Sequence, residues 1–265
     1  MKLWYQSMSR HDAGSPYRLA LKKVLARAAD PGTEIEIHAI TETAGIADDY
    51  RVMEYLDARQ VIFNAAQAQK QGYDAFLIGN VTEGGLREAR EMTEIPVLGL
   101  AETCFNFACV MGANFALITV NDKFTPRLVE SVHRYGLGQR LAGIQKMRSD
   151  PQDLKRAFAE PEHRRAILAQ FAEAAHAASA GGAEVLIPCG GVLMTLLIDE
   201  GVHQIERTPV VNGIIELVKF GEMAVKVRAL TGRFTSKRLN YAAPSGETLK
   251  RIREFYGPDM YPGAE

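Results

Sequence analysis

Short apolar runs alternate with longer segments of helical spacing along most of the chain. The runs are too short for helices and several end at a small turn residue, which predicts buried strands of a parallel sheet. Pro16 precedes one helical segment, and Gly72 and Gly112 close two others. The predicted strands are residues 2–6, 34–40, 75–78, 97–100, 115–119, 185–187 and 210–211. The predicted helices are residues 17–29, 56–71, 86–92, 103–111, 125–135, 161–180 and 214–230.

Strands that alternate with helices indicate an α/β fold in which parallel sheets are covered on both faces. An internal repeat divides the pattern in two. Residues 73–82 and residues 182–191 each form an apolar strand followed by a small polar turn, and each unit continues through a helix to a Pro-Val strand and a second helix. We expect two pseudo-symmetric Rossmann-like lobes, with the turns that begin at Asn80 and Cys189 facing each other across a cleft.

The domain boundaries follow from this repeat. We expect residues 1–115 to form a first lobe, completed by about residues 218–265, and residues 116–217 to form a second lobe. The segment after Gly232 is basic at first and is then broken by Pro244 and Gly246. We expect residues 232–265 to be a C-terminal extension, with a short helix at 248–256, that packs on the first lobe or on a neighbouring subunit.

Composition narrows the class of protein. The chain has 265 residues, of which 47% are hydrophobic, and its net charge is −1, which disfavours a nucleic-acid binder because such proteins carry a concentrated positive surface. No apolar run is long enough to span a membrane, and residues 1–11 do not resemble a signal peptide. The three cysteines are too few for a disulfide framework, so we expect a cytoplasmic protein without disulfides. No two histidines have the spacing of metal ligands, so we expect no metal site.

Cys189 is the strongest candidate for chemistry. It ends a predicted buried strand and precedes Gly190 and Gly191, which begin the next helix. Backbone N–H groups and the positive end of a helix stabilise a thiolate, so we expect the pKa of this thiol to be lowered. The amides of the two glycines can also bind a carboxylate or an enolate oxygen.

These motifs carry a resemblance. Ile-Pro-Val-Leu-Gly at 95–99, Thr-Pro-Val-Val-Asn-Gly at 208–213 and Gly-Ala-Glu-Val-Leu-Ile-Pro-Cys-Gly-Gly at 182–191 resemble the aspartate/glutamate/hydantoin racemase superfamily over roughly residues 1–230. The hydantoin racemase branch is nearest in overall pattern, and the turn at 189–193 resembles that of arylmalonate decarboxylase. The resemblance implies two α/β lobes with the substrate between them and no metal or organic cofactor. It also implies one cysteine on each lobe, on opposite faces of the substrate carbon.

The chain departs from that pattern at one position. Cys189 matches the second-lobe cysteine, but Asn80 stands at the first-lobe position, and an amide has no useful proton affinity near neutral pH. Because decarboxylation followed by protonation of an enediolate needs only one acid, we expect a decarboxylase-type lyase acting on a small carboxylate or a cyclic amide. Cys189 would be the proton donor, and Asn80 would donate a hydrogen bond to the substrate or the enolate.

Other polar residues follow the predicted strands and are candidates for substrate binding; some of these assignments are implied by the resemblance. They are Gln6, Ser7, Val81, Thr82, Thr119, Asn121, Gly190 and Gly191. Glu83 and Cys104 are candidates for a second base. They keep open the alternative of a racemase or isomerase of hydantoins or amino acids. Two further alternatives are a hydrolase with Cys189 as nucleophile, and a binding protein on a decayed racemase scaffold. The resemblance also suggests a homo-oligomer, a dimer or larger.

Overall fold

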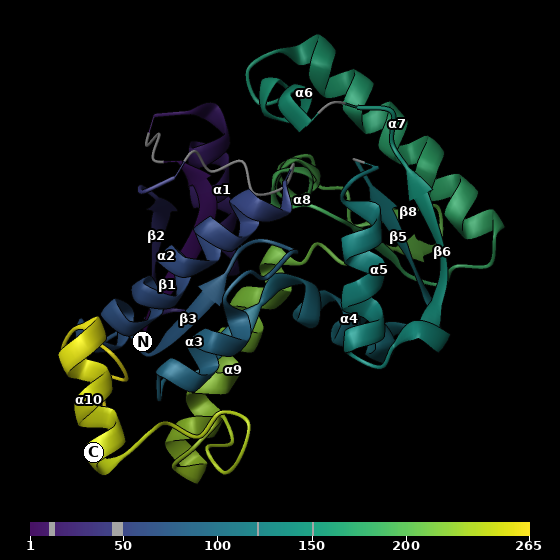
Figure 1. Cartoon of the computed structure of the whole chain (residues 1–265). Helices are drawn as coiled ribbons and strands as arrows, with labels where there is room; N and C mark the ends of the chain where they lie inside the picture. Colours follow the sequence, from purple (N-terminus) through teal and green to yellow (C-terminus); the bar gives the residue numbers. More distant parts are fainter. Residues whose placement is uncertain (11–13, 44–49, 121, 150) are drawn as a thin grey trace.

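The computed structural model describes residues 1–10, 14–43, 50–120, 122–149 and 151–265. Its first sheet has four parallel strands in the order β2-β1-β3-β4. In Figure 1, β1, β2 and β3 lie on one side of the molecule, and β5 and β6 lie on the other. The first-sheet strands are β1 (Lys2–Arg10), β2 (Glu34–Ile40), β3 (Ala75–Ile78) and β4 (Val97–Gly99), and the helices between and after them are α1 (Pro16–Ala28), α2 (Arg51–Lys70), α3 (Leu86–Met92) and α4 (Leu100–Met111).

The second sheet is also parallel, with the order β6-β5-β7. A two-stranded antiparallel ribbon, β8-β9, follows it in the chain. The strands are β5 (Phe115–Thr119), β6 (Leu141–Lys146), β7 (Leu186–Pro188), β8 (Gln204–Ile205) and β9 (Thr208–Pro209), and the helices are α5 (Thr125–Arg134), the 3-10 turn η1 (Gly138–Arg140), α6 (Pro151–Arg156), α7 (Pro161–Ala180) and α8 (Gly191–Asp199). We call the two sheets with their helices the first and second lobes.

Each face of the first sheet has its own cover. Side chains alternate along β1, so that Leu3 and Tyr5 pack with α1 and with α9 (Ile214–Thr231), whereas Trp4 packs with α2 and α3. The core that contains Leu3 and Tyr5 continues across the lobes to Phe115 of β5. The two lobes therefore share one apolar core.

Local sequence signals account for several helix boundaries. Ser15 accepts a hydrogen bond from the backbone N–H of Arg18 at 3.3 Å, and Pro16 occupies the first helical position of α1. Gly232 ends α9 in the left-handed conformation, with φ of 80°. These boundaries are the ones that the sequence signals most directly.

The structure corrects several predicted elements. Residues 210–211 do not form a strand of the second sheet, because only an isolated bridge joins Val210 to Leu186. Leu100 begins α4 instead of ending β4, and α2 begins at Arg51, five residues before the predicted start at 56. The half-buried strand β6 was not predicted, because it lacks a continuous apolar run.

The C-terminal extension lies against the first lobe. Lys237 donates hydrogen bonds to the carbonyl oxygens of Arg90, Glu91 and Thr93 at 2.6–3.0 Å, at the end of α3. Tyr261, beyond α10 (Gly246–Tyr256), donates to Glu91 at 2.6 Å. Figure 1 shows α10, in yellow, on the side of the molecule that carries the first sheet. Among the helices of the described residues, none is long and apolar enough to cross a membrane.

Candidate active site

The turns at the carboxyl ends of β3 and β7 meet. The position that a β-carbon would take on Gly191 lies 3.1 Å from the carbonyl oxygen of Gly79. Gly79 directly precedes Asn80, and Gly191 follows Cys189 by two residues. The two turns that the sequence repeat singles out are therefore in contact, as expected for strand ends that form a ligand site between α/β units.

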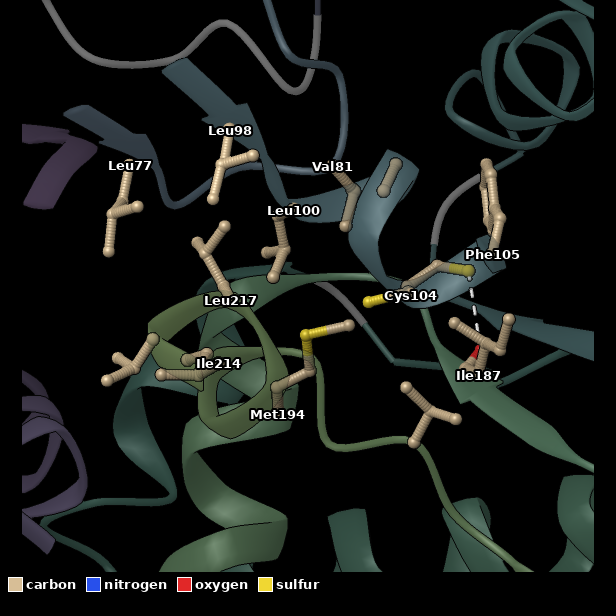
Figure 2. Packing of buried hydrophobic residues seen from close by; sticks show 14 of the residues in the cluster. Leu77, Val81, Leu98, Leu100, Cys104, Phe105, Ile187, Met194, Ile214 and Leu217 are labelled. Atoms are coloured by element: carbon tan, nitrogen blue, oxygen red, sulfur yellow. Dashed lines mark hydrogen bonds between the residues drawn. The ribbon is translucent and has the colours of Figure 1, made fainter. Parts of the chain in front are cut away.

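Cys189 is 1% exposed and is fixed at the end of β7. Its backbone N–H donates to the carbonyl oxygen of Ile118 at 2.8 Å, and its thiol donates to the carbonyl oxygen of Ile187 at 3.4 Å, the dashed line in Figure 2. Burial raises the pKa of the Cys189 thiol well above its usual value. The expectation of a lowered pKa at the start of α8 is therefore wrong for this structure, because the loss of water outweighs the hydrogen bond that favours the thiolate.

Gly190 and Gly191 begin α8. Gly190 has φ of 156° and ψ of 128°, a conformation suited to glycine, and α8 starts at Gly191. The first N–H groups of a helix have no partner within that helix and point outward from its start. This geometry places backbone donors beside Cys189, at the contact between the two turns.

Asn80 forms a tight turn with Thr82. Its side-chain oxygen Oδ1 accepts hydrogen bonds from the backbone N–H and from the hydroxyl of Thr82, both at 2.7 Å. Both residues are 8% exposed, and Val81 between them is buried at 3%. The two donors of Thr82 that the sequence analysis assigned to substrate are directed at Asn80, where they hold its side chain in place.

Glu83 has a buried carboxyl group in the turn that follows β3. It is 7% exposed and has a left-handed backbone with φ of 55°, which is uncommon for a residue with a side chain. Its Oε1 accepts the backbone N–H of Glu102 at 2.7 Å, and its Oε2 accepts the hydroxyl of Tyr135. Burial raises the pKa of Glu83 to about 7, although both hydrogen bonds lower it. An acid of this kind changes protonation state near neutral pH.

Residues of both lobes contact the Glu83 carboxyl group. Its Oε1 fills the space that a β-carbon on Gly99 would occupy, so a larger residue at the end of β4 would displace this carboxyl group. Tyr135 follows α5 in the second lobe, and burial followed by the charge of Glu83 raises the pKa of its hydroxyl. Tyr135 was missed by sequence reasoning, because a tyrosine at a helix end carries no local signal of its partner.

Cys104 is the fifth residue of α4 and is fully buried. Figure 2 shows it between Leu100 of its own helix and Ile187 and Met194 of the second lobe. Burial raises the pKa of the Cys104 thiol well above its usual value, and the charges of Glu216, Cys189 and Glu83 raise it further. Cys104 thus lies close to both Cys189 and Glu83, but as a protonated thiol.

The side chains of Gln6, Ser7 and Thr119, three further candidates, form hydrogen bonds within the protein. Gln6 accepts from Trp4 and Asn64 at 3.1 and 2.8 Å and donates to the carbonyl oxygen of Ser7 at 3.0 Å, so its side chain joins β1 to its surroundings. The hydroxyl of Ser7 accepts the N–H of Ser9 at 3.3 Å. Thr119 shares a hydrogen bond with the Thr125 hydroxyl at 2.9 Å. Asn121 lies outside the described residues.

Two parallel α/β lobes whose strand-end turns meet around a buried cysteine define an enzyme of the two-lobed racemase class. The chain belongs to the Asp/Glu/Hydantoin racemase family, whose model matches residues 16–220. Among the described residues, no group of three or more His, Cys, Asp and Glu side chains could hold a metal ion.

Curated relatives in sequence are hydantoin racemases, and solved structures share the fold. The chain is 29% identical to a hydantoin racemase of Pseudomonas sp. (strain NS671) over 90% of this chain and 93% of that protein. It is 27% identical to a hydantoin racemase of Rhizobium meliloti over 67% of this chain and 69% of that protein. The allantoin racemase from Klebsiella pneumoniae shares the fold, with a TM-score of 0.77 at 21% identity over 97% and 99% of the two chains. Unliganded arylmalonate decarboxylase has a TM-score of 0.55 at 16% identity over 84% and 92%.

Proposed function

We propose that the protein is a racemase or epimerase that acts on a cyclic amide of the hydantoin type. The observation that carries this proposal is the 29% identity to a hydantoin racemase along nine-tenths of both chains. This identity favours the isomerase alternative over the decarboxylase-type lyase, which was predicted because Asn80 stands at the first-lobe cysteine position. Both readings share the same chemistry, which is the formation and protonation of a carbanion beside a carbonyl group.

Inversion at a carbon needs proton transfer on both of its faces. Cys189 is the group on the second-lobe side, at the start of α8. We propose Glu83 as the group on the first-lobe side. A base is most effective when its pKa lies near the working pH, and burial brings the pKa of Glu83 to about 7. Glu83 is also three residues from Asn80, in the turn that contacts Gly191 through Gly79.

Cys104 is the weaker candidate for this first-lobe group. Its thiol is fully buried in the apolar core and lies against the backbone of Gly213 and the side chain of Met194. Burial favours its neutral form, as do the neighbouring carboxyl groups of Glu216 and Glu83 when they are ionised. Because the Cys104 thiol packs against Gly213 and Met194, we assign it to the packing between the lobes.

The backbone amides at the start of α8 and the Asn80 side chain would stabilise the negative oxygen of the enolate. A single hydrogen-bond donor to a developing oxyanion contributes about 3–4 kcal/mol to catalysis. Asn80 is held by Thr82, so its position is set before substrate binds. Preorganisation of this kind avoids the cost of ordering the donor during the reaction.

A decarboxylase-type lyase is the second candidate, and Asn80 is the observation that favours it. If Glu83 does not exchange a proton with substrate, only Cys189 remains as a proton-transfer group, and one acid suffices for protonation after loss of carbon dioxide. The hydrolase alternative has less support. Within the described part of the chain, the hydrogen-bond partner of the Cys189 thiol is the carbonyl oxygen of Ile187 and not a histidine that could activate it.

Incubation of single enantiomers of 5-substituted hydantoins in deuterium oxide separates these functions. A racemase gives both enantiomers with deuterium at the α-carbon, beyond the rate of an enzyme-free blank. Deuterium exchange with retention of configuration would contradict the two-face mechanism. Carbon dioxide release from arylmalonates or from 5-carboxyhydantoins, without inversion of hydantoins, would identify the lyase instead.

A further inference from the structure

Tyr5 of β1 has a buried hydroxyl group that no residue of the described part of the chain hydrogen-bonds. Its side chain is 1% exposed and lies on the face of the first sheet that α1 and α9 cover. Within the described part of the chain, no donor or acceptor is bonded to its hydroxyl oxygen. A buried hydroxyl without a partner costs about 1–3 kcal/mol, so its retention in a packed core requires an explanation.

The hydroxyl is directed at the contact between the two lobes. In the parallel register Tyr5 pairs with Leu77, so its ring extends along β3 toward the carboxyl end of the sheet. The end of the ring and its hydroxyl fill the space that a β-carbon on Gly79 would occupy. Gly79 is the residue whose carbonyl oxygen faces Gly191, which places the phenol at the base of both turns.

Electrostatic effects connect the Tyr5 hydroxyl to the candidate site through Cys104. Tyr17, Arg18 and Cys104 are close enough to affect its ionisation, and Cys104 in turn is affected by Cys189 and Glu83. Burial raises the pKa of Tyr5 well above its usual value. The hydroxyl therefore stays protonated and can act as a hydrogen-bond donor throughout the range in which enzymes of this kind are assayed.

Packing alone does not explain the oxygen atom. Phenylalanine would fill the space over Gly79 equally well and would carry no unpaired polar group. Tyr5 belongs to the apolar core that the two lobes share, and within the described residues its hydroxyl is not bonded to any group of that core. The unused donor is best explained by a partner that arrives with substrate.

We infer that the Tyr5 hydroxyl donates a hydrogen bond to the substrate oxygen that becomes negative when the α-proton is removed. This inference rests on the proposed function and deepens it: the first lobe would supply a neutral donor to the enolate oxygen, in addition to the backbone amides of the second lobe. The substrate class it favours has a carbonyl group directly beside the exchanging carbon, as in a cyclic amide or imide.

Tyr5→Phe tests the inference, because it removes only the oxygen atom. We expect kcat for hydantoin racemisation to fall by about 100-fold with little change in KM, since the bond would strengthen in the transition state. The melting temperature is expected to stay the same or to rise, because the variant loses an unpaired buried polar group. The matched control is Tyr73→Phe, at a hydroxyl that donates to Glu36 on the outer side of the first sheet.

The outcomes separate the two proposals. An active wild-type enzyme with a fully active Tyr5→Phe variant would overturn the role of Tyr5 and leave the racemase function standing. A variant that loses activity together with several degrees of melting temperature would also overturn it, in favour of a structural role. Absence of hydantoin exchange by the wild-type enzyme would overturn the proposed function itself, and the role of Tyr5 would fall with it.

Discussion

The carbonyl oxygen of Gly79 in the first lobe lies 3.1 Å from the β-carbon position of Gly191 in the second. The two turns that carry the candidate catalytic residues are thus so close that a side chain on Gly191 would contact the backbone of Gly79. Because Asn80 follows one glycine and Cys189 precedes the other by two residues, this contact fixes the spacing between the turns that carry the proposed catalytic residues of the two lobes.

Gly191→Ala is therefore expected to impair catalysis more than folding. An added methyl group would push the turns apart by a few tenths of an ångström, and small misplacements of reacting groups are costly. We expect kcat/KM to fall about tenfold, with a melting temperature close to that of the wild type. The matched control is Gly143→Ala in β6, where nothing lies within 4 Å of the new methyl group. Full activity of the Gly191 variant would show that the contact does not set the site.

Cys189→Ala is expected to lower the rate of α-proton exchange by about 1,000-fold, since it removes a general acid and base. Proton exchange is measured by NMR in deuterium oxide. The matched control is Cys109→Ala, at a half-buried cysteine near the end of α4. Retention of exchange by the Cys189 variant would remove the thiol from every mechanism considered above.

Glu83→Gln is expected to abolish the rise of kcat/KM with pH. If Glu83 is the first-lobe base, wild-type activity should increase through about pH 7 as the carboxyl group ionises. The glutamine variant should retain less than about 1% of the inversion rate. Glu88→Gln, at an exposed carboxylate of α3, is the control. A variant that still inverts substrate would leave a water molecule or Cys104 as the second group.

The same carboxyl group predicts how stability depends on pH. Its pKa is raised from 4.5 to about 7 in the folded protein, so its protonated form favours folding. This contribution is fully present below about pH 4.5 and is lost as the pH rises to 7, which amounts to about 3 kcal/mol. The difference in unfolding free energy between the wild type and Glu83→Gln, measured by urea denaturation, should change by roughly this amount across the interval. A pH-independent difference would contradict the buried acid.

Tyr135→Phe should shift the activity profile without removing the base. The Tyr135 hydroxyl donates to Glu83 and lowers the pKa of its carboxyl group, so its loss should raise that pKa further. We expect the midpoint of the pH–activity curve to move to higher pH by about one to two units, because hydrogen bonds to charged groups contribute about 1.5–3 kcal/mol and one pKa unit corresponds to about 1.4 kcal/mol. Tyr256→Phe, at an exposed residue, is the control. An unchanged midpoint would mean that Glu83 is not the titrating group.

Lys237→Met should loosen the C-terminal extension. The Lys237 ammonium donates to three carbonyl oxygens at the end of α3, and its side chain is 8% exposed. Loss of these charged hydrogen bonds is expected to cost about 1–3 kcal/mol locally. Hydrogen exchange of residues 232–265 should become faster than in the Arg238→Met control, whose side chain is exposed. Unchanged protection would show that α10 and Tyr261 hold the extension by themselves.

The pattern of apolar runs was sufficient to predict most of the fold. The strand at 75–78 has the predicted bounds, and Pro16 and Gly112 mark helix ends that the structure places there. The predictions were weaker where burial does not impose a periodic pattern. The edge strand β6 is only half buried, and residues 210–211 have the composition of a strand but make a single bridge.

The sequence by itself determined the two-lobed α/β architecture and placed Asn80 and Cys189 in equivalent turns, because periodicity and repeats are properties of local segments. Only the tertiary structure decided the chemistry of the individual groups. Burial, which depends on residues far apart in the chain, raises the pKa of Cys189 against the sequence expectation and brings that of Glu83 to about 7. The packing of the two lobes also brings the Tyr135 hydroxyl to Glu83, and among the described residues it leaves the Tyr5 hydroxyl without a partner.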